Sequence, residues 1–275
     1  MSMSWQVRLA KALQVASECA RDAGKFVLHE MHSLRPEDVA QKAPRDLVTR
    51  VDRASEEMIL GRLRKEFPDD MMLCEESGGG SPQDEHLWIV DPLDGTRNFV
   101  HRYPFFCVSI AHAVNGRVEV GAIYDPTHDE LFACKRDEGV WLNGAPIGVS
   151  TCADFGQAFV CTGFPARFQS EMDEYLKQFS AVARAAAGIR RSGSAALDLA
   201  YVACGRFDAY FEPRLAPWDM AAGGLLVEVA GGTVTDLDGR PWSLDGGGIL
   251  AANADLHAPL LTVLRTASAA VPVAN

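Results

Sequence analysis

Apolar residues recur every three or four positions near the start of the chain, a period typical of amphipathic helices. One such stripe begins at Trp5 and predicts a helix over residues 4–30. A second stripe predicts a helix over residues 52–67, with Asp52 as its N-cap and Pro68 just past its last turn.

Short apolar runs bounded by turn-forming residues follow, and these predict strands. The clearest turn signal is Asn115-Gly116, which predicts a hairpin. A glycine-rich segment, residues 77–82, predicts a flexible loop. The strands expected in this part cover residues 71–74, 87–90, 105–114, 118–124 and 130–134.

Strands and helices alternate from about residue 150. The expected strands cover residues 159–162, 207–211 and 249–252, and the expected helices cover 172–187, 194–204, 219–229 and 256–264. Residues after Arg265 are small and uncharged, so we expect fraying there. The pattern predicts a layered α+β or α/β protein, with halves 1–150 and 151–275 packed as one unit.

Composition adds a strong acidic excess to this picture. The 275 residues include 26 Lys and Arg against 37 Asp and Glu, so the formal charge is −11. Proteins that hold nucleic acid or an anionic membrane surface normally present a basic face, so we expect neither partner. An anionic ligand such as a phosphate ester would need a bound cation, and clustered carboxylates are the ligands that hard divalent metals prefer.

The rest of the composition is that of an ordinary globular protein. The chain is 48% hydrophobic and 23% charged, which excludes disorder as its main state. No apolar run approaches the ~18–20 residues that span a bilayer, and the first residues do not resemble a secretory signal. The seven cysteines form no CxxC pair, which indicates neither a disulfide framework nor a thiolate zinc site. We therefore expect a cytoplasmic protein.

The densest chemical signal is the string Trp88-Ile-Val-Asp91-Pro92-Leu93-Asp94-Gly95-Thr96-Arg-Asn98-Phe99. An apolar strand runs into two carboxylates, and Pro92 fixes the turn between them. A divalent cation is the natural counter-charge for such a pair. Gly95 allows close backbone approach, and a helix beginning near Thr96 would aim N–H groups at a phosphate oxygen. An Asx-turn followed by an Asp N-cap is the purely structural alternative.

Other acidic residues follow predicted elements in a way that suits a metal cluster. Glu75 and Glu76 stand at the end of a predicted strand, and Asp219 and Asp52 each open a predicted helix. A solvated acidic pair is the alternative for the glutamates, and helix capping is the alternative for the aspartates. Every candidate donor is an oxygen atom, so the set favours Mg²⁺.

These residues carry a family resemblance. From about residue 5 to 265 the sequence resembles the inositol monophosphatase family of metal-dependent phosphatases, especially its bacterial members. The matching motifs are Asp46-Leu-Val-Thr-Arg-Val-Asp52, Glu75-Glu-Ser77, the string over residues 88–99, Gly193-Ser-Ala195, Gly205-Arg-Phe-Asp-Ala-Tyr-Phe-Glu212, and Trp218-Asp-Met-Ala-Ala-Gly223 through Gly231-Gly232. The resemblance implies the α-β-α-β-α sandwich of that family, a homodimer, and a Mg²⁺-dependent, lithium-sensitive phosphatase.

The resemblance also implies roles for individual residues. The site would take two or three Mg²⁺ ions, one held by Glu75, Asp91 and the carbonyl of Leu93, and another by Asp91, Asp94 and Asp219. Thr96 with Asp52 would orient and deprotonate the attacking water. The resemblance implies that Glu75 is a third catalytic residue. Substrate phosphate would be bound by Leu93, Asp94, Gly95 and Thr96, and the polyol hydroxyls by Gly193, Ser194, Ala195, Glu212 and Asp219. Lys42 matches a lysine that precedes the first motif.

The substrate that the resemblance implies is a small phosphorylated polyol, myo-inositol monophosphate. Glu212 suits a polyol hydroxyl and would repel an extra phosphate group. The alternatives are the same chemistry on fructose 1,6-bisphosphate, histidinol phosphate or a 3′-phosphonucleotide, and a partner-binding protein with secondary phosphatase activity. Arg190 and Arg191 could face a substrate phosphate or a partner subunit, with a solvated pair as the structural alternative.

Overall fold

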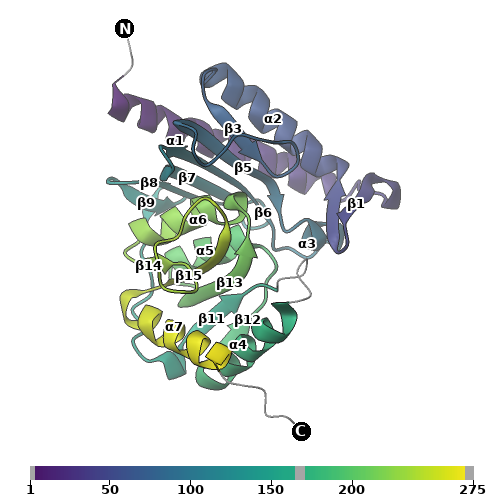
Figure 1. The fold of residues 1–275 in the computed structure, drawn as a ribbon. Coiled ribbons are helices and arrows are strands. Elements are labelled where there is room, and N and C mark those ends of the chain that lie inside the picture. Colours follow the sequence, from purple (N-terminus) through teal and green to yellow (C-terminus); the bar gives the residue numbers. More distant parts are fainter. Residues whose placement is uncertain (1–3, 165–170, 270–275) are drawn as a thin grey trace.

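The computed structural model describes residues 4–164 and 171–269. In that part of the chain, helices and sheets stack in the order helices, sheet, helices, sheet, helices (Figure 1). This is the α-β-α-β-α layering that the family resemblance implies.

The first sheet has eight strands in the order β10-β9-β8-β7-β6-β5-β3-β4. Paired strands are antiparallel except β3 and β5, which run parallel with Cys74 opposite Val90. Asn115 and Gly116 join β6 to β7, as predicted. The strands are β3 (Met71–Cys74), β4 (Gly78–Gly79), β5 (His86–Asp94), β6 (Cys107–Val114), β7 (Arg117–Asp125), β8 (Glu130–Lys135), β9 (Gly139–Leu142) and β10 (Ala145–Pro146).

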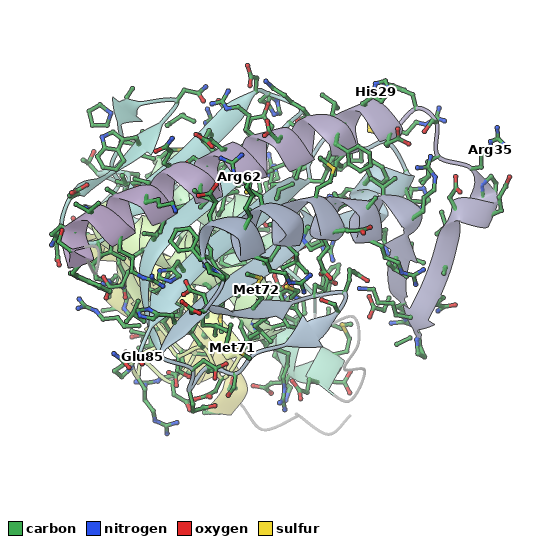
Figure 2. All side chains as sticks on the ribbon, turned by 90° about the horizontal axis from the view of Figure 1, so that it is seen from above. His29, Arg35, Arg62, Met71, Met72 and Glu85 are labelled. Carbon is green, nitrogen blue, oxygen red and sulfur yellow. The ribbon has the colours of Figure 1, made fainter. Side chains whose placement is uncertain are left out.

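Helices α1 (Trp5–Glu30) and α2 (Arg50–Glu66) cover the outer face of this sheet. They lie side by side across the strands (Figure 2), and Arg62 of α2 forms an ion pair with Glu18 of α1, with 2.9 Å between Nη2 and Oε2. Their apolar stripes pack on the sheet around Trp88, which is fully buried.

The second sheet has five strands in the order β12-β11-β13-β15-β14. β11 runs parallel to β12 and β13, whereas β15 is antiparallel to β13 and β14. The strands are β11 (Phe159–Thr162), β12 (Gly188–Arg190), β13 (Ala209–Leu215), β14 (Thr233–Thr235) and β15 (Gly247–Ala252).

Four helices enclose the second sheet. Helices α5 (Ala195–Ala203) and α6 (Pro217–Val229) fill the layer between the two sheets, and α4 (Met172–Ala185) and α7 (Ala254–Ala269) cover the outer face. None of the described helices combines the length and apolar character needed to cross a membrane.

Several boundaries near the candidate site differ from the prediction. Helix α6 begins at Pro217 rather than Asp219, and β13 covers Ala209–Leu215 rather than residues 207–211. Helix α2 begins at Arg50 rather than Asp52, because the hydroxyl of Thr49 accepts hydrogen bonds from backbone N–H groups of the first turn and caps the helix. Strand β5 continues past its predicted end through Asp91 to Asp94, with an irregular register against β6 between these two residues. The two carboxylates therefore belong to the strand itself.

Several short elements were not predicted, because their residues show no clear apolar period. They include the hairpin of β1 (Val39–Ala43) and β2 (Asp46–Thr49), the strands β9, β10, β12 and β14, and the 3₁₀ turns Pro36–Asp38 and Phe155–Gln157. A short helix, α3 (Thr96–Val100), begins where expected. Helix α7 continues past Arg265, where we expected fraying; residues 270–275 lie outside the described part of the chain.

Candidate functional site

Three carboxylates from distant parts of the chain meet where β5 ends and α6 begins. Asp91 and Asp94 come from β5, and Asp219 lies in the first turn of α6. Each offers one oxygen atom, and the three atoms lie within 4.8 Å of one another. The packing of α6 against the first sheet brings them together.

Backbone N–H groups hold each of these carboxylates. The bonds run from Leu93 N to Asp91 Oδ1 (3.0 Å), from Ala196 N to Asp94 Oδ2 (2.8 Å) and from Ala216 N to Asp219 Oδ2 (2.7 Å). The hydroxyl of Ser194 also donates to Asp94 Oδ2, at 2.7 Å. The Asx-turn alternative for Asp91 and the capping alternative for Asp219 therefore describe real local bonds. Asp94 caps no helix, because Gly95 is the N-cap of α3, and it bonds the distant Ser194 and Ala196 instead. Together these bonds orient the three carboxylates toward one another.

Burial makes the negative charge of this group costly. Desolvation, together with the charges of nearby carboxylates, raises the pKa of Asp91 and Asp219 well above the ordinary carboxyl value and that of Asp94 to about 6. A divalent cation would relieve both the burial and the repulsion. Because the donors are carboxylate oxygens, the residues present fit Mg²⁺.

Glu75 stands beside the three aspartates. It follows β3, and its negative charge contributes to the raised pKa of each aspartate. Lys42 from β1 forms ion pairs with Glu75, with 3.1 Å between Nζ and Oε1, and with Glu76. The backbone N–H of Glu76 donates to Glu56, and burial raises the Glu76 pKa to about 7. The charge of Glu75 is therefore the one that acts on the aspartates.

A threonine and a buried aspartate lie next to this group. Gly95 precedes α3 with φ 95°, in the left-handed region that glycine tolerates. The hydroxyl oxygen of Thr96 is 2.9 Å from Asp52 Oδ1 and 3.1 Å from the Leu93 carbonyl oxygen, so its one proton can be donated to either. Asp52 Oδ2 accepts from the backbone N–H and the hydroxyl of Thr49, at 2.8 and 2.6 Å. Burial raises the pKa of Asp52.

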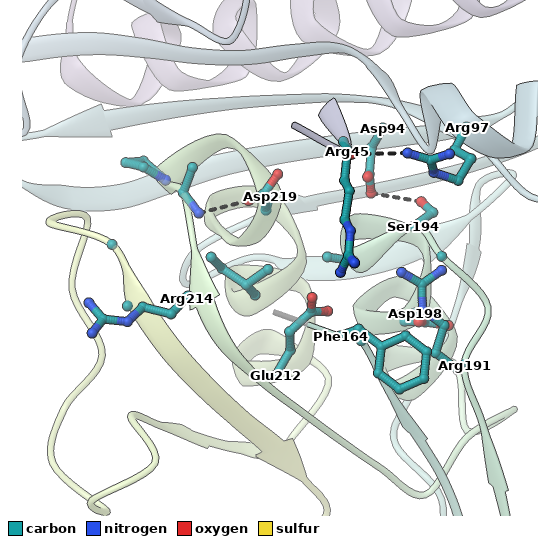
Figure 3. A pocket seen from close by; sticks show the side chains of 18 of the residues that line it. Arg45, Asp94, Arg97, Phe164, Arg191, Ser194, Asp198, Glu212, Arg214 and Asp219 are labelled. Atoms are coloured by element: carbon teal, nitrogen blue, oxygen red, sulfur yellow. Dashed lines mark hydrogen bonds between the residues drawn. The ribbon is translucent and has the colours of Figure 1, made fainter. Parts of the chain in front are cut away.

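A cavity of about 530 Å³ opens beside these residues (Figure 3). The predicted residues in its lining are Asp94, Gly193, Ser194, Ala195, Glu212 and Asp219. The structure thus brings six predicted positions from both halves of the chain around one space. The other predicted residues surround Asp94 outside the lining, and they are Asp52, Glu75, Asp91, Leu93, Gly95 and Thr96.

Glu212 extends from β13 into this cavity (Figure 3). Its carboxylate lies against Gly163, where any Cβ atom would overlap it. The hydroxyl of Tyr210 donates to Glu212 Oε2, and burial raises the Glu212 pKa to about 7. The group can therefore donate or accept a hydrogen bond near neutral pH.

The loop before α5 forms another part of the lining. Ser194 caps α5 and bonds Asp94, and Gly193 has φ 97°, with a hypothetical Cβ only 2.7 Å from Arg191 Nη1. The side-chain amide of Asn98, on α3, donates to the Ser192 carbonyl oxygen at 2.9 Å. The loop is thus tied to both β5 and α3.

Some lining residues were missed by the sequence analysis. Arg45 enters from the turn between β1 and β2, and its carbonyl oxygen accepts a hydrogen bond from Arg97, at 3.0 Å. For Arg191 the sequence left a substrate phosphate, a partner subunit and solvent open. Its side chain lines the cavity, with the guanidinium carbon 5.1 Å from the centre of the Phe164 ring. Asp198 also lines the cavity. A lone carboxylate in an apolar helix was a usable signal for Asp198, whereas nothing local marks Arg45 or Phe164.

Comparisons with known proteins agree over nearly the whole chain. The model of the "Inositol monophosphatase family" matches residues 8–269. The chain is 43% identical over 258 residues to "Nus factor SuhB" of Pseudomonas aeruginosa, covering 92% of this chain and 95% of that protein. The solved inositol monophosphatase from Anabaena (Nostoc) sp. PCC 7120 has a TM-score of 0.85 at 41% identity, covering 94% and 97% of the two chains. Extragenic suppressor protein suhB from Bartonella henselae has a TM-score of 0.87 at 39% identity, covering 93% and 98%.

Proposed function

The chain belongs to the inositol monophosphatase family, and on that premise we propose that it hydrolyses myo-inositol monophosphate to inositol and phosphate with bound Mg²⁺. The observation that carries the proposal is the convergence of Asp91, Asp94 and Asp219 beside a cavity that also holds Glu212. One ligand in this cavity could therefore contact both a cation held by the aspartates and the carboxyl group of Glu212.

Oxygen donors would hold the metal ions. We assign one ion to Glu75, Asp91 and the Leu93 carbonyl, and another to Asp91, Asp94 and Asp219, with a third ion left open. When bound, Mg²⁺ supplies charge neutralisation, water activation and leaving-group stabilisation. The raised pKa of the aspartates supports this assignment, because a cation would offset the repulsion that raises it.

Thr96 and Asp52 are assigned to the attacking water. The Thr96 hydroxyl can donate to Asp52 Oδ1 and accept a hydrogen bond from the water with its lone pair. Asp52 then holds the proton that the pair withdraws, and its contacts with Thr49 keep it in place. Glu75, whose charge acts on Asp52 and on the three aspartates, completes the catalytic set.

Backbone groups are assigned to the substrate phosphate. The first N–H groups of a helix have no partner within the helix, so Thr96 at the start of α3 can offer one, together with Gly95. The Leu93 N–H is already donated to Asp91, and its carbonyl oxygen cannot donate to a phosphate, so Leu93 would act on the phosphate only through the Mg²⁺ that its carbonyl is assigned to hold. For the polyol hydroxyls we assign Gly193, Ser194, Ala195, Glu212 and Asp219, all of which line the cavity beside Asp94.

A phosphate-release screen tests the proposal. The substrates are myo-inositol 1-phosphate, fructose 1,6-bisphosphate, histidinol phosphate, a 3′-phosphonucleotide and p-nitrophenyl phosphate, each with Mg²⁺, with EDTA and with added Li⁺. We expect Mg²⁺-dependent, Li⁺-inhibited turnover that is fastest with inositol phosphate. Asp94→Asn should abolish turnover and keep the fold, whereas Asp173→Asn, an exposed residue in the first turn of α4, should change neither. Near-normal activity of Asp94→Asn would show that the metal assignment is wrong.

A substrate with a second anionic group is the alternative that a specific observation favours. Among the residues that the structure describes, four arginines line the cavity, namely Arg45, Arg97, Arg191 and Arg214. Guanidinium groups bind phosphate well, so they could hold a second phosphate. Faster turnover of fructose bisphosphate or the phosphonucleotide would favour this candidate.

A partner-binding role is supported by the name of the Pseudomonas relative, "Nus factor SuhB". It would become the main function if every phosphate in the screen were a poor substrate. We also propose a homodimer, which analytical ultracentrifugation can test. A cytoplasmic location is supported by the seven cysteines, all free thiols as a reducing compartment requires.

A further inference from the structure

Asp198 is a buried carboxylate that the proposed chemistry does not yet use. It is the only charged residue of α5, it is 1% exposed, and it lines the cavity. No residue in the described part of the chain forms a hydrogen bond with its Oδ1. Buried polar atoms nearly always have a partner, so this exception needs a cause.

Local structure does not supply that cause. Ser194 already caps α5, and its hydroxyl oxygen accepts the Leu197 N–H at 3.4 Å. An acidic residue in the first turn interacts favourably with the helix dipole, but this needs no burial. An apolar residue would fill the same position among apolar neighbours without leaving an unpaired oxygen.

The groups around Asp198 belong to the cavity. Burial raises its pKa; the side chain of Ser192 and the charge of Arg191 act against this, while Glu212 and Asp94 add to it. Figure 3 shows Asp198 and Arg191 to one side of Glu212. The carboxyl group therefore lies at the end of the cavity where we place the polyol, and a cavity of about 530 Å³ is in the range that holds small ligands.

From this geometry we infer that Asp198 binds substrate directly, with Oδ1 accepting a hydrogen bond from one hydroxyl of a polyol while Glu212 binds another. The inference rests on the proposed function and deepens it. The ligand class is a phosphate monoester of a polyol with free hydroxyls remote from the phosphate. A hydroxyl suits this position better than an ammonium group, because Arg191 already supplies a positive charge there.

Two substitutions of similar size test the inference. Asp198→Leu removes both oxygens, and Asp198→Asn keeps one acceptor. We expect Asp198→Leu to raise the KM for myo-inositol 1-phosphate about 10- to 100-fold, with p-nitrophenyl phosphate within about twofold of wild type. The KM of Asp198→Asn for myo-inositol 1-phosphate should lie between those of wild type and Asp198→Leu. Asp255→Leu, at an exposed first-turn position of α7, is the matched control and should change neither KM.

The comparison of substrates separates binding from a structural role. A structural role for Asp198 would disturb the loop that holds Asp94, and both substrates would lose activity together; that result, or an unchanged KM, overturns the inference. If wild-type protein hydrolyses neither substrate, the proposed function fails. The same variants are then compared by thermal shift with myo-inositol 1-phosphate and Mg²⁺. If Asp198→Leu loses the thermal shift that wild type shows, the inference is supported. If the variant keeps the full shift, or wild type shows none, the inference is overturned.

Discussion

At the scale of single residues, four aspartates of the site each accept a hydrogen bond from a backbone N–H with one oxygen. This holds for Asp52, Asp91, Asp94 and Asp219. A carboxylate held at one oxygen cannot rotate freely, so its other oxygen is directed in advance. Asparagine can accept the same N–H bond with its side-chain oxygen, so Asp→Asn changes should alter charge more than fold.

Thr96 offers a direct test of the water-orienting pair. Replacing Thr96 by Val removes the hydroxyl and keeps the branched shape, so we expect kcat for inositol phosphate to fall about 100-fold or more, the range of a lost acid–base contribution. Thr96→Ser keeps the hydroxyl and should retain most of the activity. Both are measured by phosphate release at saturating Mg²⁺. Wild-type kcat in the Val variant would exclude a role for this hydroxyl.

Glu212 should make stability depend on pH. Its pKa is raised by burial from 4.5 to about 7, so between these values the unfolded chain has lost a proton that the folded chain keeps. The free energy of unfolding therefore falls as pH rises through this window, by up to about 3 kcal/mol, and is level above it. Glu212→Gln should lack this contribution and so fall less than wild type, because the other buried carboxylates with raised pKa values still contribute theirs. Urea denaturation of both proteins in EDTA at pH 4.5 and 8 measures it; parallel curves would contradict the assignment.

At the scale of secondary-structure elements, a buried polar network ties the outer helix layer to the first sheet. Asp70, before β3, accepts hydrogen bonds from Trp88 of β5 at 3.0 Å and from Arg8 of α1, and its Oδ2 lies 3.2 Å from His112 Nε2 of β6. Burial opposes the Asp70 charge, but the His112 hydrogen bond and the Arg8 charge outweigh it and lower the Asp70 pKa. Three elements, α1, β5 and β6, thus share one carboxylate.

Breaking this network should destabilise the fold in a pH-dependent way. Asp70→Asn should lower the free energy of unfolding at pH 7 by about 2–4 kcal/mol, because it leaves buried donors poorly paired. A lowered carboxyl pKa stabilises above the ordinary value of 3.8, so the difference from wild type should shrink as the pH falls toward 3. Asp69→Asn, its exposed neighbour, is the control. Equal losses of unfolding free energy in the two variants would show that the network does not cause the destabilisation.

At the scale of the whole molecule, the formal charge of −11 opposes any anionic substrate. Three aspartates of the site add their charge at the point where the phosphate would bind. The attraction must then come from bound cations, helped by backbone N–H groups and cavity arginines.

Metal removal tests this balance. Without Mg²⁺ we expect the affinity for inositol phosphate to fall at least about tenfold, measured by calorimetry in EDTA. Mg²⁺ alone, at 100 times its Kd, should stabilise the fold by about 2.7 kcal/mol, and Asp219→Asn should lose much of that gain. Equal substrate affinity with and without Mg²⁺ would show that the metal does not carry phosphate binding.

The amino-acid sequence alone determined the long helices, the strands around Asn115-Gly116 and the chemical character of the site. These depend on local interactions: apolar periodicity for α1 and α2, turn propensity for the β6–β7 hairpin, and carboxylates at the end of an apolar run for Asp91 and Asp94. The family resemblance added Asp219 and Glu212 to the site. Because they are far from Asp91 and Asp94 in sequence, no local pattern shows that they lie near them.

Only the tertiary structure decided which residues share the cavity. The polar β1–β2 hairpin has no apolar period, so neither its presence nor the entry of Arg45 could be predicted. Glu75 and Glu76 are equivalent in sequence until β3 is placed against β5. Asp198 becomes a candidate binding residue only because the structure shows an unpaired oxygen on its side chain, near Glu212. Local propensities reflect neighbours along the chain, whereas the site is formed by long-range packing of two sheets against a shared helix layer.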